Sequence, residues 1–492
     1  MKVFAINHGF HYEIENLTRV FFPNEKIEIL KESCPSCGCG ASHIVTAREY
    51  SGDEIILTCS FSAGEYKKTD TVRLSLNCTD DEQERLLAVM LYKILCEYTG
   101  LTPPWGILTG VRPIKLFRRL REAGGEEYAE RYFLDKLLVS APKTELSAVT
   151  EKNERRILET SKPNSFSLYV SVPFCPSRCS YCSFVSQSVE KSFKLIEPYV
   201  ELLCREIEYT GKIAKELSLR LESVYIGGGT PTTLNVCQLE AVMGAINRSF
   251  DMSFCREFTV EAGRPDTVTE EKLLAIKRCG GRRISINPQT LNNEILRQIG
   301  RRHTSEEFFQ AYETAKRVGF DHINTDLIAG LPAESAQSFK NTLDGIAALD
   351  PESITVHTLS MKRSSNLTAQ GTELLRKDIA AAEQMHSYCG ELLPQRGYEP
   401  YYLYRQSRMV GNLENVGWSK KGSEGLYNVF IMDETHTVLG CGAGATTKLK
   451  QPNGPYIERI FNYKYSYEYL TGFDEIIRRK DRFKSFYEEY GF

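Results

Sequence analysis

The central part of the chain alternates between two hydrophobic periodicities. Between residues 166 and about 360, short runs of β-branched and aromatic residues are typical of strands, and apolar residues spaced three and four apart between them predict amphipathic helices. The strand-like runs end near Val172, Ile226, Glu261, Asn287, Leu327 and His357. The helices are expected near 190–218, 236–249, 269–278, 292–318 (in two pieces) and 335–348. Six strands in this alternation predict a parallel sheet with right-handed crossovers and functional residues at the carboxyl ends of its strands.

The two ends of the chain have a different pattern. Residues 1 to about 80 contain strand-like runs at 2–7, 55–59 and 71–76, and the apolar spacing at 80–98 predicts a helix that stops at Gly100. Prolines and glycines at 103–116 predict an ordered loop before a helix, in which Arg112 and Lys115 either contact an anion or are simply solvated.

A polar turn at 161–165 marks a domain boundary. Beyond residue 360, a helix is expected at 377–393, and the basic residues at 478–484 are expected on a solvated helix. We therefore expect an N-terminal α+β domain (1–160), an α/β domain (161–365) and a C-terminal region (366–492).

Three cysteines follow the first strand of the α/β domain. Cys175, Cys179 and Cys182 have the spacing C-x3-C-x2-C. Three thiolates on one short loop can hold three irons of a [4Fe–4S] cube, which leaves the fourth iron open to another ligand. A zinc loop or three unrelated buried cysteines are the alternatives. Zinc favours four protein ligands with cysteine pairs two or four apart, so this spacing and the preceding strand favour the cluster.

Polar residues and glycines also stand at the ends of the later strands. Three consecutive glycines and Thr230 follow the second strand, and glycines let backbone groups approach a ligand closely. Glu261 ends the third strand, Gln289 and Arg301 follow the fourth, and Asp326 lies inside the apolar fifth. A buried carboxylate needs a partner, which a ligand ribose or an arginine such as Arg301 would supply. Each of these residues alone could cap a loop, but their joint placement favours a binding site.

Composition narrows the function classes. The net charge of −3 argues against a broad nucleic-acid interface, and no apolar run is long enough to span a bilayer. The N-terminus lacks the apolar stretch of a signal peptide, and 15 scattered cysteines suit a reducing cytoplasm. A second possible metal site has no further C-x2-C pair at zinc-ribbon spacing, so incidental thiols at a hairpin tip are the favoured interpretation. Its residues are Cys34, Cys37, Cys39 and His43.

The motifs together resemble the radical S-adenosylmethionine (SAM) enzymes. Over residues 166 to about 450 they are similar to the oxygen-independent coproporphyrinogen III oxidases and their haem-chaperone relatives. The segments that carry the resemblance are Pro-Phe-Cys, Gly-Gly-Gly-Thr-Pro-Thr, Val-Glu-Ala, Ile-Ser-Ile-Asn-Pro-Gln, Gly-Arg-Arg-His-Thr and Thr-Asp-Leu-Ile-Ala-Gly-Leu-Pro. The N-terminal domain with Leu-Thr-Gly-Val-Arg-Pro, and Val-His-Thr-Leu-Ser after the last strand, resemble the HemZ-like branch.

The resemblance implies a partial (β/α)6 barrel whose open iron binds SAM and whose C-terminal region covers the barrel mouth and the substrate. It implies that SAM contacts residues from every strand end, and that two tyrosines, Tyr169 and Tyr181, line its pocket. The implied SAM contacts are Gly228, Gly229, Thr230, Glu261, Gln289, Arg301 and Asp326. A low-potential electron donor such as flavodoxin or ferredoxin is implied as the partner.

By the same resemblance, an adenosyl radical takes a β-hydrogen from a propionate of coproporphyrinogen III. Loss of carbon dioxide and one electron then leaves a vinyl group, and two rounds give protoporphyrinogen IX. Two departures leave alternatives open: Phe184 stands where the bacterial oxidase type has a further cysteine, and Ser171 where both types usually have histidine. The alternatives are a haem-binding chaperone and a radical enzyme acting on another tetrapyrrole. Lys362 and Arg363 could meet substrate carboxylates, although adjacent cations are more often solvated.

Overall fold

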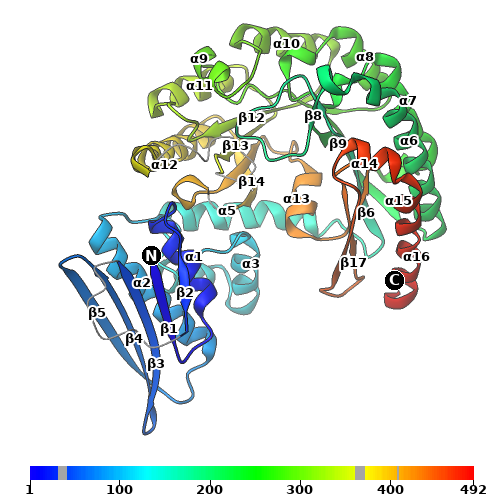
Figure 1. Cartoon of the computed structure of the whole chain (residues 1–492). Helices are drawn as coiled ribbons and strands as arrows, with labels where there is room; N and C mark the ends of the chain where they lie inside the picture. The colour runs from blue at the N-terminus through cyan, green and yellow to red at the C-terminus, as the bar shows by residue number, and fades with distance from the viewer. Residues whose placement is uncertain (32–41, 361–371, 407–408, 492) are drawn as a thin grey trace. The chain divides into compact units, whose positions relative to one another are not determined.

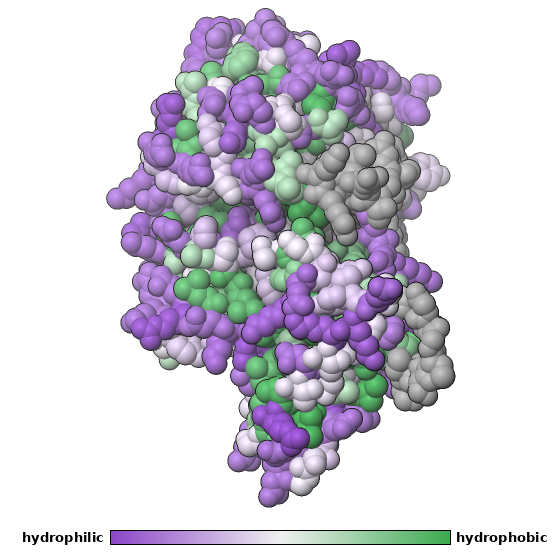
Figure 2. Space-filling model, turned by 90° about the vertical axis from the view of Figure 1, so that its left-hand side faces the viewer, coloured by the Kyte–Doolittle hydropathy of each residue, from purple (hydrophilic) through white to green (hydrophobic). Residues whose placement is uncertain are grey.

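The computed structural model describes residues 1–31, 42–360, 372–406 and 409–491 (Figure 1). Contacts divide the chain into two compact units. The first contains residues 1–151, 371–380 and 404–414, and the second contains residues 152–370, 381–403 and 415–492. On the face drawn in Figure 2, hydrophilic side chains predominate and hydrophobic ones form smaller patches between them. None of the helices in the described ranges combines the length and the apolar composition needed to cross a membrane.

The first unit is an α+β fold on a five-stranded sheet of order β2-β1-β3-β4-β5. Its strands are β1 (Lys2–Ile6), β2 (Glu28–Leu30), β3 (His43–Ser51), β4 (Glu54–Ala63) and β5 (Tyr66–Ser75). β1 is parallel to β2 and β3, whereas β3, β4 and β5 form an antiparallel meander. Helix α2 (Asp80–Thr99) packs on β4 and β5, and α1 (His11–Phe21) packs on α2. The helix predicted at 80–98 is confirmed, and Gly100 ends it in the left-handed conformation.

The loop predicted at 103–116 is ordered and leads into a helix, as expected. Trp105 is fully buried, and its indole N–H donates a 2.7 Å hydrogen bond to Glu414 in the segment 404–414. The backbone N–H of Arg405 donates 2.8 Å to the carbonyl of Val111. The helical elements that follow are α3 (Pro113–Gly124), α4 (Glu126–Arg131), a π-helical turn (Tyr132–Lys136) and α5 (Ala141–Leu158).

The second unit is an α/β fold around an open, 11-stranded sheet. At its centre six parallel strands stand in the order β13-β12-β11-β10-β9-β6. They are β6 (Ser165–Val172), β9 (Arg220–Gly228), β10 (Glu257–Glu261), β11 (Arg283–Ser285), β12 (His322–Ala329) and β13 (Ser353–Thr358). Each ends within two residues of the end that the sequence predicts. The predicted parallel α/β sheet is therefore confirmed.

The crossover helices lie along the outer side of this sheet (Figure 1). They are α6 (Val189–Glu216), α7 (Val236–Ser249), α8 (Glu270–Arg278), α9 (Asn293–Gln298), α10 (Ser305–Val318) and α11 (Ala336–Ala348). Two of them start with a capping box, in which Asn235 or Thr304 and the third helical residue exchange hydrogen bonds. The helix start predicted at 236 is confirmed, whereas only the outer bounds 292–318 were predicted for α9 and α10.

The C-terminal residues extend the sheet at both edges. β16 (Thr437–Cys441) is parallel to β6 and is followed by β17 (Thr446–Lys450) and β18 (Ile457–Phe461). At the other edge, β15 (Asn415–Ser419) is antiparallel to β13 and is followed outward by β14 (Glu399–Tyr404). The remaining helices are α12 (Thr372–Gln395), α13 (Leu426–Asp433), α14 (Ser466–Thr471), α15 (Phe473–Lys480) and α16 (Arg482–Tyr490).

Helix α13 is attached to the amino ends of the barrel strands. The backbone N–H of Leu426 donates 2.5 Å to the carboxylate of Glu257, the first residue of β10. Arg283, the first residue of β11, donates 2.7 Å to the carbonyl of Ser423. This part of the C-terminal region therefore closes the amino edge of the sheet. Coverage of the carboxyl edge by residues 366–492 stays a prediction.

The prediction of a solvated basic tail is wrong for Lys480. This lysine is 2% exposed, and its ammonium lies 3.0 Å from the carboxylate of Glu206, which is fully buried on α6. The same carboxylate accepts from the phenol of Tyr469 at 2.6 Å and from the backbone of Gly442 at 2.7 Å. A charged pair can be buried when both partners are also hydrogen-bonded, which periodicity alone does not reveal.

Candidate functional site

The cysteine triad, Cys175, Cys179 and Cys182, lies on the loop that leaves the carboxyl end of β6. All three thiols are free and partly buried. The loop begins and ends in two short paired strands, β7 (Phe174–Cys175) and β8 (Gln187–Ser188). Burial raises the pKa of Cys182 to about 11, so a metal must displace the proton of this thiol.

Arg264 is a site residue that the sequence analysis did not single out. Its guanidinium is 3% exposed and donates to the Cys179 sulfur at 3.7 Å and to the Ser177 hydroxyl at 3.1 Å. The carboxylate of Asp266 accepts from its Nε and Nη2 at 3.2 and 3.3 Å. Arg264 thus brings a positive charge to the triad and fixes the loop that carries it. Its position three residues after Glu261 was the available signal.

The glycines after β9 make room for the cysteine loop. Gly228 has φ +106°, and a Cβ at Gly229 would lie 2.6 Å from the carbonyl of Phe174 and 3.0 Å from the Cys175 sulfur. The backbone N–H of Thr230 donates 2.7 Å to that same carbonyl, and its hydroxyl donates 3.6 Å to the Cys175 sulfur. The close approach that three glycines indicate is therefore, in this structure, an approach of backbone to the cysteine loop.

Glu261 ends β10 inside the barrel and is hydrogen-bonded to a tyrosine. The phenol of Tyr225 on β9 donates 2.5 Å to its Oε1. Burial raises the pKa of the Glu261 carboxyl to about 7, although this hydrogen bond opposes the shift. Tyr225 stacks on Tyr427 at 4.5 Å and on Tyr169 at 6.4 Å between ring centroids, with interplanar angles of 23° in both pairs. Of these three rings, only Tyr169 was predicted from the sequence to line the site.

Asp326 on β12 has a different partner from the arginine that the sequence suggested. The Asn324 amide donates 2.7 Å to its Oδ1, and the His357 ring lies 3.7 Å from its Oδ2. Burial alone would raise the pKa of Asp326, but His357 and Asn324 outweigh it, and the pKa lies below the usual value. The Asp326 side chain is 19% exposed and that of His357 is 31% exposed, so both face accessible space.

Gln289 is strained and has an unsatisfied side chain. Its φ of +69° lies in the left-handed region, where a non-glycine residue costs roughly 1–3 kcal/mol. The backbone at Gln289 pairs with β12, because its N–H donates 3.0 Å to the carbonyl of Asp326. Its Oε1 is buried without a hydrogen-bond partner among the described residues. Strain together with an orphan acceptor favours a ligand-binding role.

Arg301 is buried, and its contacts are with the backbone and Tyr181 rather than with Asp326. Its guanidinium donates 2.5 Å to the carbonyl of Asn287 and 3.3 Å to that of Gly263. Nε donates 3.2 Å to the phenol of Tyr181, between the second and third triad cysteines. The suggested Arg301–Asp326 pair is therefore not formed, because Arg301 instead joins the cysteine loop to the ends of β10 and β11.

The donor set fits an iron–sulfur cluster better than a single ion. Among the residues that the structure describes, no three His, Cys, Asp or Glu side chains converge where one metal ion could bind. Each thiolate of a [4Fe–4S] cluster binds a different iron, so the triad need not converge on one point. Donors from Arg264 and Thr230 already reach two of the sulfurs. These residues, with the orphan Oε1 of Gln289, fit a cluster and a polar ligand beside it.

Ser171 is hydrogen-bonded to the loop that follows β16. Its hydroxyl donates a 2.7 Å hydrogen bond to the carbonyl of Ala443. A Cβ at Gly442 would lie 2.4 Å from the backbone carbonyl of Ser171. The loop after β16 therefore packs against this end of β6 too closely for a side chain at Gly442. Lys362 and Arg363, and the possible second metal site at Cys34, Cys37 and Cys39, lie outside the described residues.

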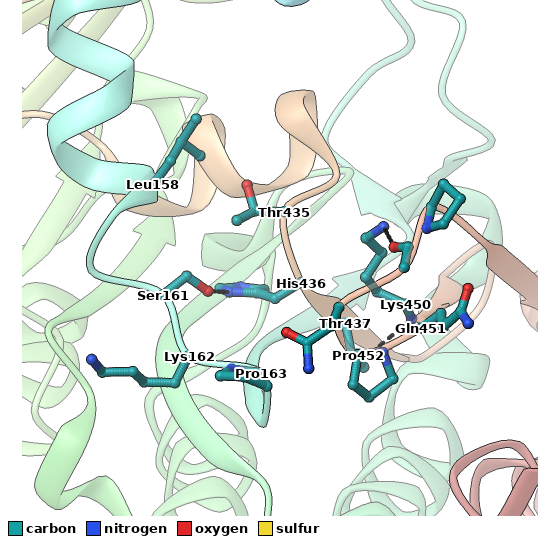
Figure 3. A pocket seen from close by; sticks show the side chains of 13 residues that line it. Leu158, Ser161, Lys162, Pro163, Thr435, His436, Thr437, Lys450, Gln451 and Pro452 are labelled. Atoms are coloured by element: carbon teal, nitrogen blue, oxygen red, sulfur yellow. Dashed lines mark hydrogen bonds between the residues drawn. The ribbon is translucent and has the colours of Figure 1, made fainter. Parts of the chain in front are cut away.

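A pocket of about 480 Å³ lies beside the residues that precede β6, at the other end of this strand from the cysteine loop. Figure 3 shows the side chains that line it. His436 lines it, and its two ring nitrogens lie 2.9 and 2.8 Å from the hydroxyls of Ser161 and Ser167. Burial lowers the pKa of His436 to about 3, so the ring is neutral and already satisfied. This pocket holds none of the predicted site residues.

Comparison with known proteins places this geometry in a family. Residues 169–346 match the model of the radical SAM superfamily. The chain is 36% identical over 401 residues to the oxygen-independent coproporphyrinogen-III oxidase-like protein HemZ of Bacillus subtilis, covering 81% of this chain and 80% of the relative. It is 30% identical to the heme chaperone HemW of the same organism, covering 62% of this chain and 79% of the relative.

A solved structure shows the same fold. Coproporphyrinogen III oxidase HemN from Escherichia coli superposes with a TM-score of 0.52 at 21% identity, covering 65% of this chain and 72% of that one. The fold match and the extent of the likeness to HemZ lead to one conclusion. The chain belongs to the radical SAM superfamily, whose members use a [4Fe–4S] cluster and SAM, and to its HemZ-like branch.

Proposed function

We propose that the chain catalyses the oxygen-independent decarboxylation of coproporphyrinogen III, converting two propionates to vinyl groups and giving protoporphyrinogen IX in haem biosynthesis. The observation that carries this proposal is the extent of the likeness to HemZ, which takes in 81% of the chain, whereas that to HemW takes in 62%. The likeness to HemZ takes in more of the chain than the likeness to HemW does, and this favours the HemZ-type activity over haem transfer.

In this proposal the triad holds the cluster, and the strand ends hold SAM. When bound, the two groups supply the radical that abstracts a hydrogen atom from the substrate. The polar contacts to SAM come from Glu261, Gln289, Arg301 and Asp326, and Gly228, Gly229 and Thr230 keep the cysteine loop close to them. Tyr181 lines the SAM pocket and Arg264 positions the triad.

The interior of the barrel supports a flat aromatic ligand. Tyr169, Tyr225 and Tyr427 stack with interplanar angles of 16 to 23°, and together they form an aromatic wall beside Glu261. Such a wall would pack against the adenine of SAM or the face of a tetrapyrrole.

A haem chaperone is the second candidate, and one observation favours it. Phe184 stands where the oxidase type carries a further cysteine, and its side chain is 63% exposed, so it offers no metal ligand there. A relative named heme chaperone HemW is 30% identical to this chain over 322 residues. A radical enzyme acting on another tetrapyrrole is the third outcome that an experiment must distinguish.

The test is an anaerobic reaction of reduced, cluster-loaded protein with SAM and coproporphyrinogen III, followed for 5′-deoxyadenosine and, after oxidation, protoporphyrin. Deoxyadenosine that rises in step with the vinyl product supports the proposal. Stoichiometric haem binding without substrate-dependent SAM cleavage points to the chaperone. Cleavage that only haem triggers points to the third activity.

A further inference from the structure

We propose that an exposed aromatic surface beside the cysteine loop is the docking site of an acidic protein that carries one electron to the cluster. We call this surface the aromatic face. It comprises exposed residues from the cysteine loop, α6 and the start of α14: Phe184, Val185, Phe193, Tyr465 and Tyr467. The inference rests on the proposed function only in that the triad holds a redox cluster.

The aromatic face begins at the triad itself. Phe184 and Val185 directly follow the cysteine loop and are 63% and 37% exposed. Two residues of extended chain span at most about 7 Å, so Phe184 lies that close to Cys182 along the backbone. A protein seated on Phe184 would therefore be near any group that the triad holds. Large apolar side chains exposed this strongly, several together, are typical of interaction surfaces.

One oxygen atom brings the other parts of the face together. Oε1 of Gln187 accepts from the hydroxyl of Ser192 at 2.9 Å and from that of Ser466 at 2.7 Å. Phe193, next to Ser192, is 74% exposed. Tyr465 and Tyr467, on either side of Ser466, are 51% and 64% exposed. The hydrogen bonds thus fix three segments of the second unit side by side, each presenting an exposed aromatic ring.

The charges around the aromatic face select the partner. Five exposed basic side chains lie on the loop, at the start of α6, after α9 and before α14: Arg178, Lys191, Lys194, Arg302 and Lys464. Three exposed acidic side chains share this surface: Glu190, Glu197 and Glu468. Glu190 is paired with Arg302 at 2.7 Å. The face is therefore locally basic although the whole chain has a net charge of −3, and an acidic partner complements it.

An aromatic centre with a charged rim fits a brief encounter with a redox partner. Aromatic residues are enriched at protein interfaces, and electron-transfer complexes use the smallest of them. In the step itself one electron leaves the reduced carrier and enters the cluster, so the carrier is oxidised and the cluster reduced. No bond forms or breaks. A flavodoxin, which is acidic and carries one electron at low potential, is the probe that fits this surface.

The experiment measures binding of flavodoxin to the full-length chain at low and at moderate salt. We expect the double variant Lys191→Glu/Lys194→Glu to bind at least ten-fold more weakly than wild type, with a shallower salt dependence, because the rim charges steer the encounter. Phe193→Ala should also bind more weakly. The matched control is Lys212→Glu/Lys215→Glu, the same change on exposed lysines at the far end of α6, which should bind like wild type.

The outcomes separate this inference from the proposed function. Equal binding by wild type, both double variants and Phe193→Ala would overturn the docking site, as would a loss of self-association in these variants without any change in flavodoxin binding. Selective weakening supports it whether or not the chain converts coproporphyrinogen III, because flavodoxin binding does not depend on that substrate. Reduction of the cluster by dithionite at the same rate in all variants then shows that the variants affect the partner and not the cluster. A chain that assembles the cluster and binds flavodoxin selectively but forms no vinyl product would support the docking site and refute the proposed function.

Discussion

The hydrogen bond between Tyr225 and Glu261 should control the pH at which SAM binds. Burial raises the pKa of Glu261 from 4.5 to about 7. Between pH 4.5 and about pH 7 the unfolded chain therefore binds fewer protons at Glu261 than the folded chain does. The free energy of unfolding falls as the pH rises through this range. The shift corresponds to about 3 kcal/mol, fully lost above pH 7. A cationic ligand would offset this cost by neutralising the carboxylate.

We expect SAM affinity to rise as the pH increases through about 7, because the charged form of Glu261 attracts the cation. Tyr225→Phe removes a hydrogen bond of 2.5 Å to that charged form. Such a bond is worth ~1.5–3 kcal/mol, which raises the pKa by roughly one to two units. At pH 7 about half of Glu261 is charged in wild type, so the variant should bind SAM roughly five- to fifty-fold more weakly, and it should recover at higher pH.

The assay is equilibrium dialysis of labelled SAM from about pH 6 to about pH 9, a range that brackets the raised pKa. Glu261→Gln removes the titrating group and separates its effect from the titration of SAM itself. Tyr427→Phe is the matched control, because it removes a hydroxyl from the same stack without a bond to Glu261. Parallel pH profiles for wild type and Glu261→Gln, or an undisplaced profile for Tyr225→Phe, would refute the reasoning.

Three further predictions concern the loop and the core. Replacing any triad cysteine by alanine should abolish the reconstituted cluster spectrum, whereas Cys237→Ala, at an exposed thiol, should keep it; unchanged iron content in all the triad variants would contradict this. Arg264→Gln should lower the cluster reduction potential by on the order of 100 mV in an electron paramagnetic resonance titration, because a cation near Cys179 is lost; an unchanged potential would argue against its role. Glu206→Gln should destabilise the chain by about 3–5 kcal/mol in chemical denaturation, because Lys480 keeps a buried charge without its partner; a change below about 1 kcal/mol would be the opposing result.

The sequence predicted the barrel well because periodicity and helix caps are local signals. All six parallel strands and their crossover helices were expected, since each alternates clearly with the next. The N-terminal sheet was predicted less completely. β2 and β3 were not identified, because β2 has only three residues and β3 mixes polar with apolar positions. The domain boundaries stay a prediction.

Side-chain partners could not be predicted in the same way. Tyr225 and Tyr427 meet only because β9 and α13 bring together residues about 200 positions apart, and no local pattern reports that. Asp326 was given Arg301 as a possible partner, but Arg301 has backbone acceptors of its own. Lys480 was placed in solvent because one basic residue among several has no pattern that marks it as buried.

The central claim, that this chain abstracts hydrogen from a propionate side chain, is tested most directly by isotope transfer. Coproporphyrinogen III deuterated at the β-positions of its propionates is incubated anaerobically with SAM and the reduced, cluster-loaded chain. The account predicts deuterium in the 5′-deoxyadenosine formed, in proportion to the vinyl product. Deoxyadenosine without deuterium, or tight haem binding with no cleavage of SAM in the presence of this substrate, would contradict it.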